Sequence, residues 1–321
     1  MKAVFCEELG SPQQLVVRDI DPPPAPEEGE IKVVLGARGV SFTDILMIKG
    51  EYQAKPDLPF IVGGEASGVI TEVGPKEHDF SVGDLVLVGG GCVEEVVVKS
   101  SRATLLPPGT DLEAAAAFRG NYATALYGMQ RANLQAGETL LVHGAAGGVG
   151  LAAVDIGKLM GARVIGTASN EAKLAVIKEM GGDHVIDYGD GFREQVKALT
   201  NGKGADVIYD PVGGDVFDES MRCIAPFGRI LIVGFTSGRA ALAKTNHLLI
   251  KDASVIGYTM GGLQRHDPQR AAKNGAILLD WLASGRIHPY ISHRLPLEET
   301  ADALQLIIDR KVIGKAIVVS P

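Results

Sequence analysis

The chain has 321 residues, 46% of them hydrophobic and 22% charged, a composition typical of a globular protein with one large domain or two smaller ones. Its formal net charge of −8 argues against nucleic acid or an anionic membrane surface as a partner. The sequence shows neither an apolar run of the roughly 20 residues that span a bilayer nor a signal-peptide pattern, and its three scattered cysteines fit a reducing compartment, so a cytoplasmic protein is expected.

The first part of the chain, up to about residue 110, is predicted to form short strands separated by turns. The β-rich segments are bounded by glycine or proline and read AVFCEEL, QLVVRDI, EIKVVLGARGV, SGVITEVG, DLVLV and VEEVVVK. Residues 21–30 (DPPPAPEEGE) contain four prolines, which remove backbone donors and fix φ, so no regular structure is expected there. The pattern predicts a small, partly open β domain of barrel type.

After about residue 120, strands and helices alternate. The expected strands are TLLVHGA, ARVIGTA, DHVIDY, ADVIYDP and GRILIVGF, and the expected helices cover 149–160, 171–180, 191–200, 215–224 and the region 241–250. Apolar strands separated by helices are typical of a doubly wound parallel sheet, which binds ligands at the carboxyl ends of its strands. The last part of the chain, with helices at 268–284 and 298–309, a short strand near ISHRL and a final strand KAIVVS, either closes this sheet or returns to the first domain.

The segment LLVHGAAGGVGLAAV (140–154) joins the first strand of the alternating region to a helix through a burst of glycines. Glycines permit a tight turn and a close approach of the backbone to a pyrophosphate, which the helix N-terminus binds through its N–H groups and its dipole. The spacing is G-x-x-G-x-x-G rather than G-x-G-x-x-G, and a plain tight β–α turn is the alternative, but the place at the start of a βαβ unit favours a dinucleotide. The predicted cofactor-binding residues of this loop are Gly144, Ala146, Gly147, Gly148, Val149 and Gly150.

The end of the second strand distinguishes NAD from NADP. An NAD site has an acidic residue about 20 residues after the glycine loop, whereas this strand ends in Thr-Ala-Ser-Asn (167–170). Ser169, Lys173 and, at the end of the next strand, Tyr188 suit contacts with a 2′-phosphate. Taken singly, Ser169 or Asn170 is better explained as a helix cap and Lys173 as a solvated surface lysine. Together with the missing acid, they predict NADPH as the cofactor.

Seven segments follow one another in a characteristic order: GVSFTDILMIKGEYQ (39–53), LPFIVGGEASGVITEVG (58–74), YATALYGM (122–129), GETLLVHGAAGGVGLAAV (137–154), GGDHVIDY (181–188), YDPVGG (209–214) and GRILIVGF (228–235). With them the chain resembles, essentially end to end, the quinone oxidoreductase (zeta-crystallin-like) branch of the medium-chain dehydrogenase/reductase superfamily. The resemblance implies an α/β protein with a GroES-like, partly open β-barrel catalytic domain, a doubly wound Rossmann domain and an active site in the cleft. The implied domains are 1–121 (catalytic), 122–261 (NADPH-binding) and 262–321, a C-terminal segment that completes the catalytic domain.

The same superfamily contains zinc alcohol dehydrogenases, in which a cysteine stands at the position of Ser41 and a histidine precedes the acid that is Glu65 here. This chain has serine at the first position and Gly64 at the second. Catalytic zinc takes three protein ligands and structural zinc four, but the three cysteines lie in unrelated segments, and His288 and His293 flank a Pro-Tyr turn. Neither zinc site is therefore expected.

The remaining candidate residues come from the resemblance. Tyr52 matches a tyrosine beside the substrate cleft, where a phenol would donate a hydrogen bond or a proton to the acceptor oxygen; the alternative is an amphipathic residue at the rim. Ser41 stands where close relatives often have asparagine near the nicotinamide ribose, and a hydroxyl cannot replace both the donor and the acceptor of an amide. Thr124, Phe235 in the pair that ends the sixth strand of the sheet, and Arg310 match cofactor contacts, the last towards the 2′-phosphate.

These features predict an NADPH-dependent, zinc-independent oxidoreductase that transfers hydride or electrons to a quinone. Two alternatives stay open: an NADPH-dependent reductase of α,β-unsaturated carbonyls or enoyl thioesters, or a non-enzymatic, crystallin-like NADPH-binding protein. Arg119, next to Asn121 in a segment that departs from the family pattern, is a surface charge or, less simply, a contact for an acidic acceptor. The resemblance also implies a homodimer, paired through the edge of the nucleotide-domain sheet, where residues 246–258 (NHLLIKDASVIGY) would supply the edge strand.

Overall fold

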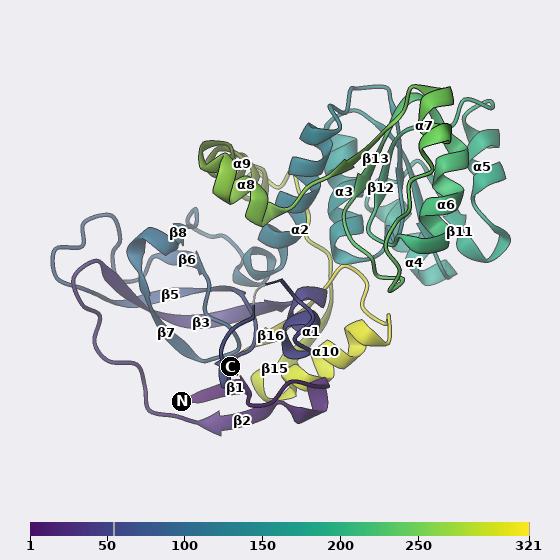
Figure 1. The fold of residues 1–321 in the computed structure, drawn as a ribbon. Coiled ribbons are helices and arrows are strands. Elements are labelled where there is room, and N and C mark those ends of the chain that lie inside the picture. The colour runs from purple at the N-terminus through teal and green to yellow at the C-terminus, as the bar shows by residue number, and fades with distance from the viewer. Residues whose placement is uncertain (54, 321) are drawn as a thin grey trace. The chain divides into compact units, whose positions relative to one another are not determined.

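The computed structural model describes residues 1–53 and 55–320, apart from the side chain at position 190 (Figure 1). The chain forms two compact units: unit 1 comprises residues 1–119 and 289–321, and unit 2 comprises residues 120–288. Within the described ranges, every helix is too short or too polar to span a bilayer.

Unit 1 is a β domain built around one long strand, β3 (Glu30–Val40). Because β5 pairs with one edge of β3 along most of its length, β7 and β16 share the other edge, at residues 30–34 and 37–40. The larger sheet has the order β15-β16-β3-β5-β6-β8 with β7 on β3, and the smaller has the order β2-β1-β4. The other strands are β1 (Lys2–Cys6), β2 (Val16–Asp19), β4 (Phe60–Ile61), β5 (Glu65–Val73), β6 (Leu85–Val88), β7 (Glu95–Lys99), β8 (Thr104–Leu105), β15 (Ile291–Pro296) and β16 (Lys315–Val319).

Short helices complete unit 1. The α-helices are α1 (Phe42–Ile48), α10 (Thr300–Ile308) and the first part of α2 (Leu112–Arg131), and the 3₁₀ helices are η1 (Pro12–Gln14), η2 (Ser100–Arg102) and η4 (Leu297–Glu299). The antiparallel pairing of β16 with β3 brings the end of the chain back to the first domain, because the apolar residues of β16 are buried against the core that β3 helps to form.

Unit 2 contains a six-stranded, wholly parallel sheet of order β11-β10-β9-β12-β13-β14, which confirms the predicted doubly wound fold. Figure 1 shows its strands between α3 on one side and α5 and α6 on the other. The strands are β9 (Thr139–Val142), β10 (Arg163–Ala168), β11 (His184–Asp187), β12 (Ala205–Asp210), β13 (Ile224–Ile232) and β14 (Ser254–Gly257). The helices are α3 (Gly148–Leu159), α4 (Glu171–Glu179), η3 (Tyr188–Asp190), α5 (Arg193–Leu199), α6 (Gly214–Cys223), α7 (Thr245–Lys251), α8 (Met260–His266) and α9 (Pro268–Ala283).

The strand order reverses between β9 and β12, which are neighbours in the sheet although the strands β10 and β11 and the helices around them separate the two in sequence. In open parallel sheets, ligands bind at such a switch point, outside the carboxyl ends of the strands. The fold therefore predicts a ligand site among the residues that follow β9, β10, β12 and β13.

The division of the chain differs from the predicted domain boundaries in one segment. Residues 262–288 were expected in the C-terminal part of the catalytic domain, but α8 and α9 belong to unit 2. The side chain of Asn274 in α9 is 2% exposed and exchanges two hydrogen bonds with Gln130 of α2, at 2.8 and 3.0 Å. This buried pairing, 144 residues apart in sequence, keeps α9 on unit 2.

Candidate functional site at the carboxyl edge of the parallel sheet

The glycine loop leaves β9 at the switch point and enters α3 in a single tight turn. Gly144 has a φ of +53°, and its carbonyl accepts a hydrogen bond from the N–H of Gly147, the N-cap of α3, at 2.9 Å. A Cβ on Gly150 would lie 2.3 Å from the carbonyl oxygen of Gly144, so only glycine lets the helix approach the loop this closely. These three glycines therefore determine the shape of the loop.

The N–H groups of the loop serve two purposes. The N–H of Gly144 donates to Tyr188 Oη at 2.6 Å, so it is used within the protein. Gly148 and Val149 open α3, and N–H groups in the first turn of a helix have no carbonyl one turn earlier to bind. Ala146, 3% exposed, lies between the two sets. With the positive end of the helix dipole, these N–H groups make the first turn of α3 a candidate anion site.

Asn121 of α2 lies directly against this anion site. A Cβ on Gly148 would be 2.6 Å from Nδ2 of Asn121, which places the carboxamide beside the first turn of α3. The next residue, Tyr122, donates its hydroxyl proton to Asp155 of α3 at 2.8 Å and so holds the two helices together. Sequence reasoning noted Asn121 only as a departure from the family pattern and gave it no role, because its neighbour at the loop is 27 positions away.

Two of the residues predicted for the 2′-phosphate, Ser169 and Tyr188, follow neighbouring strands of the sheet. β10 and β11 are parallel neighbours, with Ala168 opposite Asp187, so Ser169 and Tyr188, which follow these strands, lie at the same end. The side chain of Asn170 accepts the N–H of Lys173 at 3.0 Å and is therefore the cap of α4. Ser169, the residue before it, is exposed. Because Asn170 already caps α4, Ser169 is not needed as the helix cap.

Two further predicted cofactor contacts lie in unit 2. The hydroxyl of Thr124 donates to the carbonyl of Gly120 at 2.7 Å, one turn back in α2. Phe235 is 46% exposed and lies three residues beyond β13, which ends at Ile232 and is the fifth strand of the sheet in chain order rather than the sixth. The strand count was wrong by one. A Cβ on Gly213 would lie 3.1 Å from Phe235, so the loops after β12 and β13 touch.

Asp210, at the carboxyl end of β12, is a residue of this edge to which sequence reasoning gave no role. It is 1% exposed, and its Oδ1 accepts the N–H groups of Val212 at 2.8 Å and Gly213 at 2.9 Å. Its Oδ2 is buried without a hydrogen-bond partner in the described part of the chain. Burial raises the pKa of this carboxyl, and the two N–H groups offset part of that rise. The Asp-Pro turn after a buried strand was the available sequence signal.

Three predicted residues lie in unit 1. Ser41 is the N-cap of α1, and its N–H and its hydroxyl both donate to Asp44 Oδ2, at 2.7 and 2.8 Å. Tyr52 follows α1 and is half-buried, with its N–H on the carbonyl of Leu46 at 3.2 Å. Arg310 is exposed just after α10, with a φ of +57°.

A buried ion pair stands next to Ser41. Lys315 Nζ lies 3.6 Å from Glu65 Oε2, with 7% and 13% of the two side chains exposed. Lys315 reaches across β3 at Gly39, where a Cβ would lie 2.8 Å from the Cε of the lysine. Burial raises the pKa of the nearby Asp44, while the hydrogen bond from Ser41 and the charge of Lys315 lower it. Lys315 thus lies near two carboxyl groups with little exposure to solvent.

Replacing Lys315 by methionine is expected to lower the free energy of unfolding by about 3 kcal/mol, because Glu65 and the nearby Asp44 would lose the positive charge of this buried lysine. The measurement is urea unfolding of the variant and the parent protein. Lys76→Met is the matched control, since the pair of Lys76 with Glu28 is 73% and 63% exposed and should contribute less than about 0.5 kcal/mol. Equal losses in the two variants would contradict this account.

A metal site would require several His, Cys, Asp or Glu side chains close together. Within residues 1–53 and 55–320, no three or more His, Cys, Asp and Glu side chains are grouped as a metal site would require. All three cysteines (Cys6, Cys92 and Cys223) are buried and unpaired.

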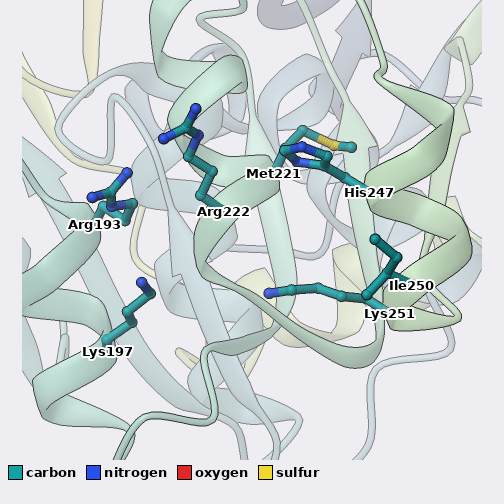
Figure 2. A pocket seen from close by; sticks show the side chains of 7 residues that line it. All are labelled: Arg193, Lys197, Met221, Arg222, His247, Ile250 and Lys251. Carbon is teal, nitrogen blue, oxygen red and sulfur yellow. The ribbon is translucent and has the colours of Figure 1, made fainter.

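A cavity of about 470 Å³ lies between α5, α6 and α7 (Figure 2). Its lining residues are Arg193, Lys197, Met221, Arg222, His247, Ile250 and Lys251. Lys251 extends from α7 towards α5 and donates to the carbonyl of Ile224, the first residue of β13. The cavity is therefore at the amino ends of the strands, opposite the end that carries the glycine loop. Lys197, Arg222 and Lys251 lie in the last turns of their helices, where positive charge stabilises the helix dipole. This structural role accounts for three of the basic residues that line the cavity.

Comparison with known proteins gives consistent matches over the whole chain. The family model described as alcohol dehydrogenase GroES-like domain matches residues 27–135, and the one described as zinc-binding dehydrogenase matches residues 148–276. A quinone oxidoreductase-like protein 2 homolog of Nematostella vectensis is 41% identical over 325 residues, covering 99% of this chain and 88% of that protein. A probable oxidoreductase from Mycobacterium abscessus is 37% identical, with a TM-score of 0.89 over 100% of this chain and 99% of that one. The quinone oxidoreductase of Escherichia coli complexed with NADPH is 27% identical, with a TM-score of 0.89 over 100% of both chains.

Proposed function

Because this chain belongs to the quinone oxidoreductase branch of the medium-chain dehydrogenase/reductase superfamily, we propose that it is an NADPH-dependent oxidoreductase that reduces a quinone without zinc. One observation carries the proposal: at the carboxyl edge of the six-stranded sheet, an anion site at the start of α3 stands beside a second strand that ends without an acidic residue. Such an edge suits a dinucleotide with an additional phosphate on its ribose.

We assign the pyrophosphate to the N–H groups of Gly148 and Val149, and the 2′-phosphate to Ser169, Lys173 and Tyr188. Hydroxyl and ammonium donors form strong, charge-assisted hydrogen bonds with a phosphate, whereas a carboxylate at the end of β10 would repel it. Three further residues remain predicted cofactor contacts: Thr124, Phe235 and Arg310.

When bound, NADPH supplies a hydride from its nicotinamide, and the chain contributes orientation and hydrogen bonds. The phenol of Tyr52 is assigned to the acceptor oxygen, as hydrogen-bond donor and proton source. Ser41 gives its hydroxyl proton to Asp44, so it offers only lone pairs, to a donor on the cofactor. A quinone is already activated by conjugation, and positions 41 and 64 lack the zinc ligands of metal-dependent relatives, which supports hydride transfer without metal.

The decisive experiment measures anaerobic initial rates of NADPH and NADH oxidation with an ortho-quinone, a para-quinone, an enone and an acyl-CoA alkene, with and without chelator. The proposal expects quinone turnover with NADPH that survives chelation. Turnover with the enone or the thioester alone would move the function to double-bond reduction, for which Arg119 would be a contact for an acidic acceptor. Tight NADPH binding without turnover would instead indicate a non-enzymatic NADPH-binding protein, and loss of activity with chelator would contradict zinc independence.

Ser169→Asp is expected to reverse the cofactor preference. A carboxylate at the end of β10 would repel the 2′-phosphate and accept hydrogen bonds from the ribose hydroxyls of NADH, so kcat/KM for NADPH should fall by about 30- to 100-fold, with little change for NADH. The ratio of the two kcat/KM values measures the effect. Ser237→Asp, exposed on the loop after β13, controls for the added charge. Equal changes with both cofactors would remove Ser169 from the phosphate site.

We also propose that two copies pair through β14, in keeping with the expectation for residues 246–258. β14 is the edge strand of the sheet, and α7, which precedes it, exposes Leu249 by 80% and Ile250 by 78%. An open strand edge and large exposed apolar side chains each favour association with another protein surface. Light scattering of the parent protein and of Ile250→Glu tests this, since a dimer of about twice the 33.7 kDa chain should dissociate in the variant. The buried, unpaired cysteines suit the cytoplasm.

A further inference from the structure

His143 is a buried titratable residue that the proposed function leaves without a role. It directly follows β9 and precedes Gly144, and its side chain is 0% exposed. Its N–H donates to the carbonyl of Tyr209 at 3.0 Å, which fixes the backbone at the point where the chain leaves the sheet. A buried imidazole is costly unless both ring nitrogens have hydrogen-bond partners.

Both partners are present, and they determine the tautomer. Nε2 of His143 lies 2.8 Å from Ser220 Oγ in α6, and Nδ1 lies 3.2 Å from Thr167 Oγ1 in β10. Ser220 donates its one hydroxyl proton to the carbonyl of Val216 at 2.7 Å, so it accepts the proton on Nε2. Nδ1 is then the acceptor of the Thr167 hydroxyl, whose other acceptor, the carbonyl of Val142, is farther away at 3.5 Å. Burial lowers the pKa of His143 to about 3, so the ring is neutral and held in one orientation.

The oriented ring packs against two aromatic side chains. Its centroid lies 6.2 Å from that of Tyr188, with the planes 24° apart, and 4.6 Å from that of Phe192, with the planes 63° apart. Tyr188 and Phe192 also meet edge to face, at 6.4 Å. The phenol ring of Tyr188 therefore rests on an imidazole whose own position is fixed by Ser220 and Thr167. The hydroxyl end of Tyr188 accepts the N–H of Gly144 at 2.6 Å.

We propose that His143 is a positioning residue for the cofactor: held by Ser220 and Thr167, it keeps Tyr188 on the N–H of Gly144 and so fixes the turn that presents the first N–H groups of α3. The inference rests on the proposed function in one respect, that the loop binds NADPH. It adds that a buried hydroxyl of α6, which contacts the imidazole of His143, controls affinity through that ring.

The test uses Ser220→Ala, Tyr188→Phe and the double variant. Thr200→Val is the matched control, because the hydroxyl of Thr200 also donates to the carbonyl four residues earlier, at 2.8 Å, and accepts one buried N–H, that of Gly204, at 2.9 Å. Two properties are measured: the NMR chemical shift of the Gly144 amide in the protein without cofactor, and the dissociation constant for NADPH.

Ser220→Ala should shift the Gly144 amide resonance upfield and raise the dissociation constant by about five- to tenfold, the effect of one weakened hydrogen bond. The kcat at saturating NADPH should stay unchanged. The double variant should be no weaker in binding than Tyr188→Phe alone, because both substitutions act on one hydrogen bond. Thr200→Val should lower stability without moving either readout.

An unmoved Gly144 resonance in Ser220→Ala, or effects on affinity that simply multiply in the double variant, would overturn the inference. A parent protein that fails to bind NADPH would refute the proposed function instead, and the amide shift would still report on the link between Ser220 and Gly144.

Discussion

Replacing Gly150 by alanine is expected to abolish measurable NADPH binding and to lower the free energy of unfolding by about 3 kcal/mol. The added Cβ would lie 2.3 Å from the carbonyl oxygen of Gly144 and 2.7 Å from the Cα of Ala145. Both atoms belong to the backbone, so no side chain can turn away to relieve the overlap. Either α3 moves away from the sheet or the turn at Gly144 opens, and both changes displace the N–H groups assigned to the pyrophosphate.

Gly275→Ala is the control for this substitution. Gly275 also lies within a helix of unit 2, α9, but a Cβ there would meet no atom within 4 Å. Alanine is the better helix former, so this variant should gain about 0.5–1 kcal/mol and bind NADPH like the parent protein. Titration calorimetry with NADPH and urea unfolding measure the two effects. Retained binding in Gly150→Ala would contradict the assigned anion site.

Lowering the pH is expected to destabilise unit 2 through His143. Burial lowers the pKa of this residue to about 3 in the folded protein, against 6.5 for an ordinary histidine. Between these values the unfolded chain binds a proton that the folded chain does not, so the free energy of unfolding falls as the pH falls. The contribution is complete above pH 6.5 and is lost towards pH 3, for a total of about 4–5 kcal/mol.

The comparison with His143→Gln isolates this contribution. Glutamine retains a donor and an acceptor but does not titrate in this range. Burial raises the pKa of Asp155 and Asp210 in the same unit, which stabilises the folded state as the pH falls and opposes the effect of histidine in both proteins. Between pH 7 and pH 4.5, the parent protein should lose about 2–3 kcal/mol more than the variant. Urea unfolding followed by the fluorescence of Trp281, the one tryptophan of the chain, reports on unit 2. Equal losses would refute this account.

The sequence by itself determined the architecture of both units and the place of the glycine loop between β9 and α3. The alternation of apolar strands with helices specifies a parallel sheet, because side chains buried on both faces and helical crossovers leave few other arrangements. The glycine loop was also recognisable in the sequence, because the φ of +53° at Gly144 and the close backbone approach at Gly150 both require glycine. The missing acid after β10 is likewise a local feature of the chain.

Only the tertiary structure decided which residues far apart in sequence contact one another. Tyr188 was predicted as a phosphate contact, but its bond to Gly144, 44 positions away, depends on the packing of β11 and η3 beside the loop. Glu65 forms an ion pair with Lys315, which is 250 positions along the chain. No local sequence pattern predicts this pair. Residues 246–258, expected as an edge strand, divide into most of α7 and the four-residue β14.

The common reason is physical. Helix periodicity and glycine conformation depend on residues that are neighbours in sequence, so both can be predicted from the sequence. The choice of hydrogen-bond partner for a buried group depends on which strands and helices the core brings within 3 Å of it, and His143, Ser220 and Thr167 meet only after the sheet has formed. The sequence therefore located the glycine turn between β9 and α3, and the tertiary structure decided which buried side chains surround that turn.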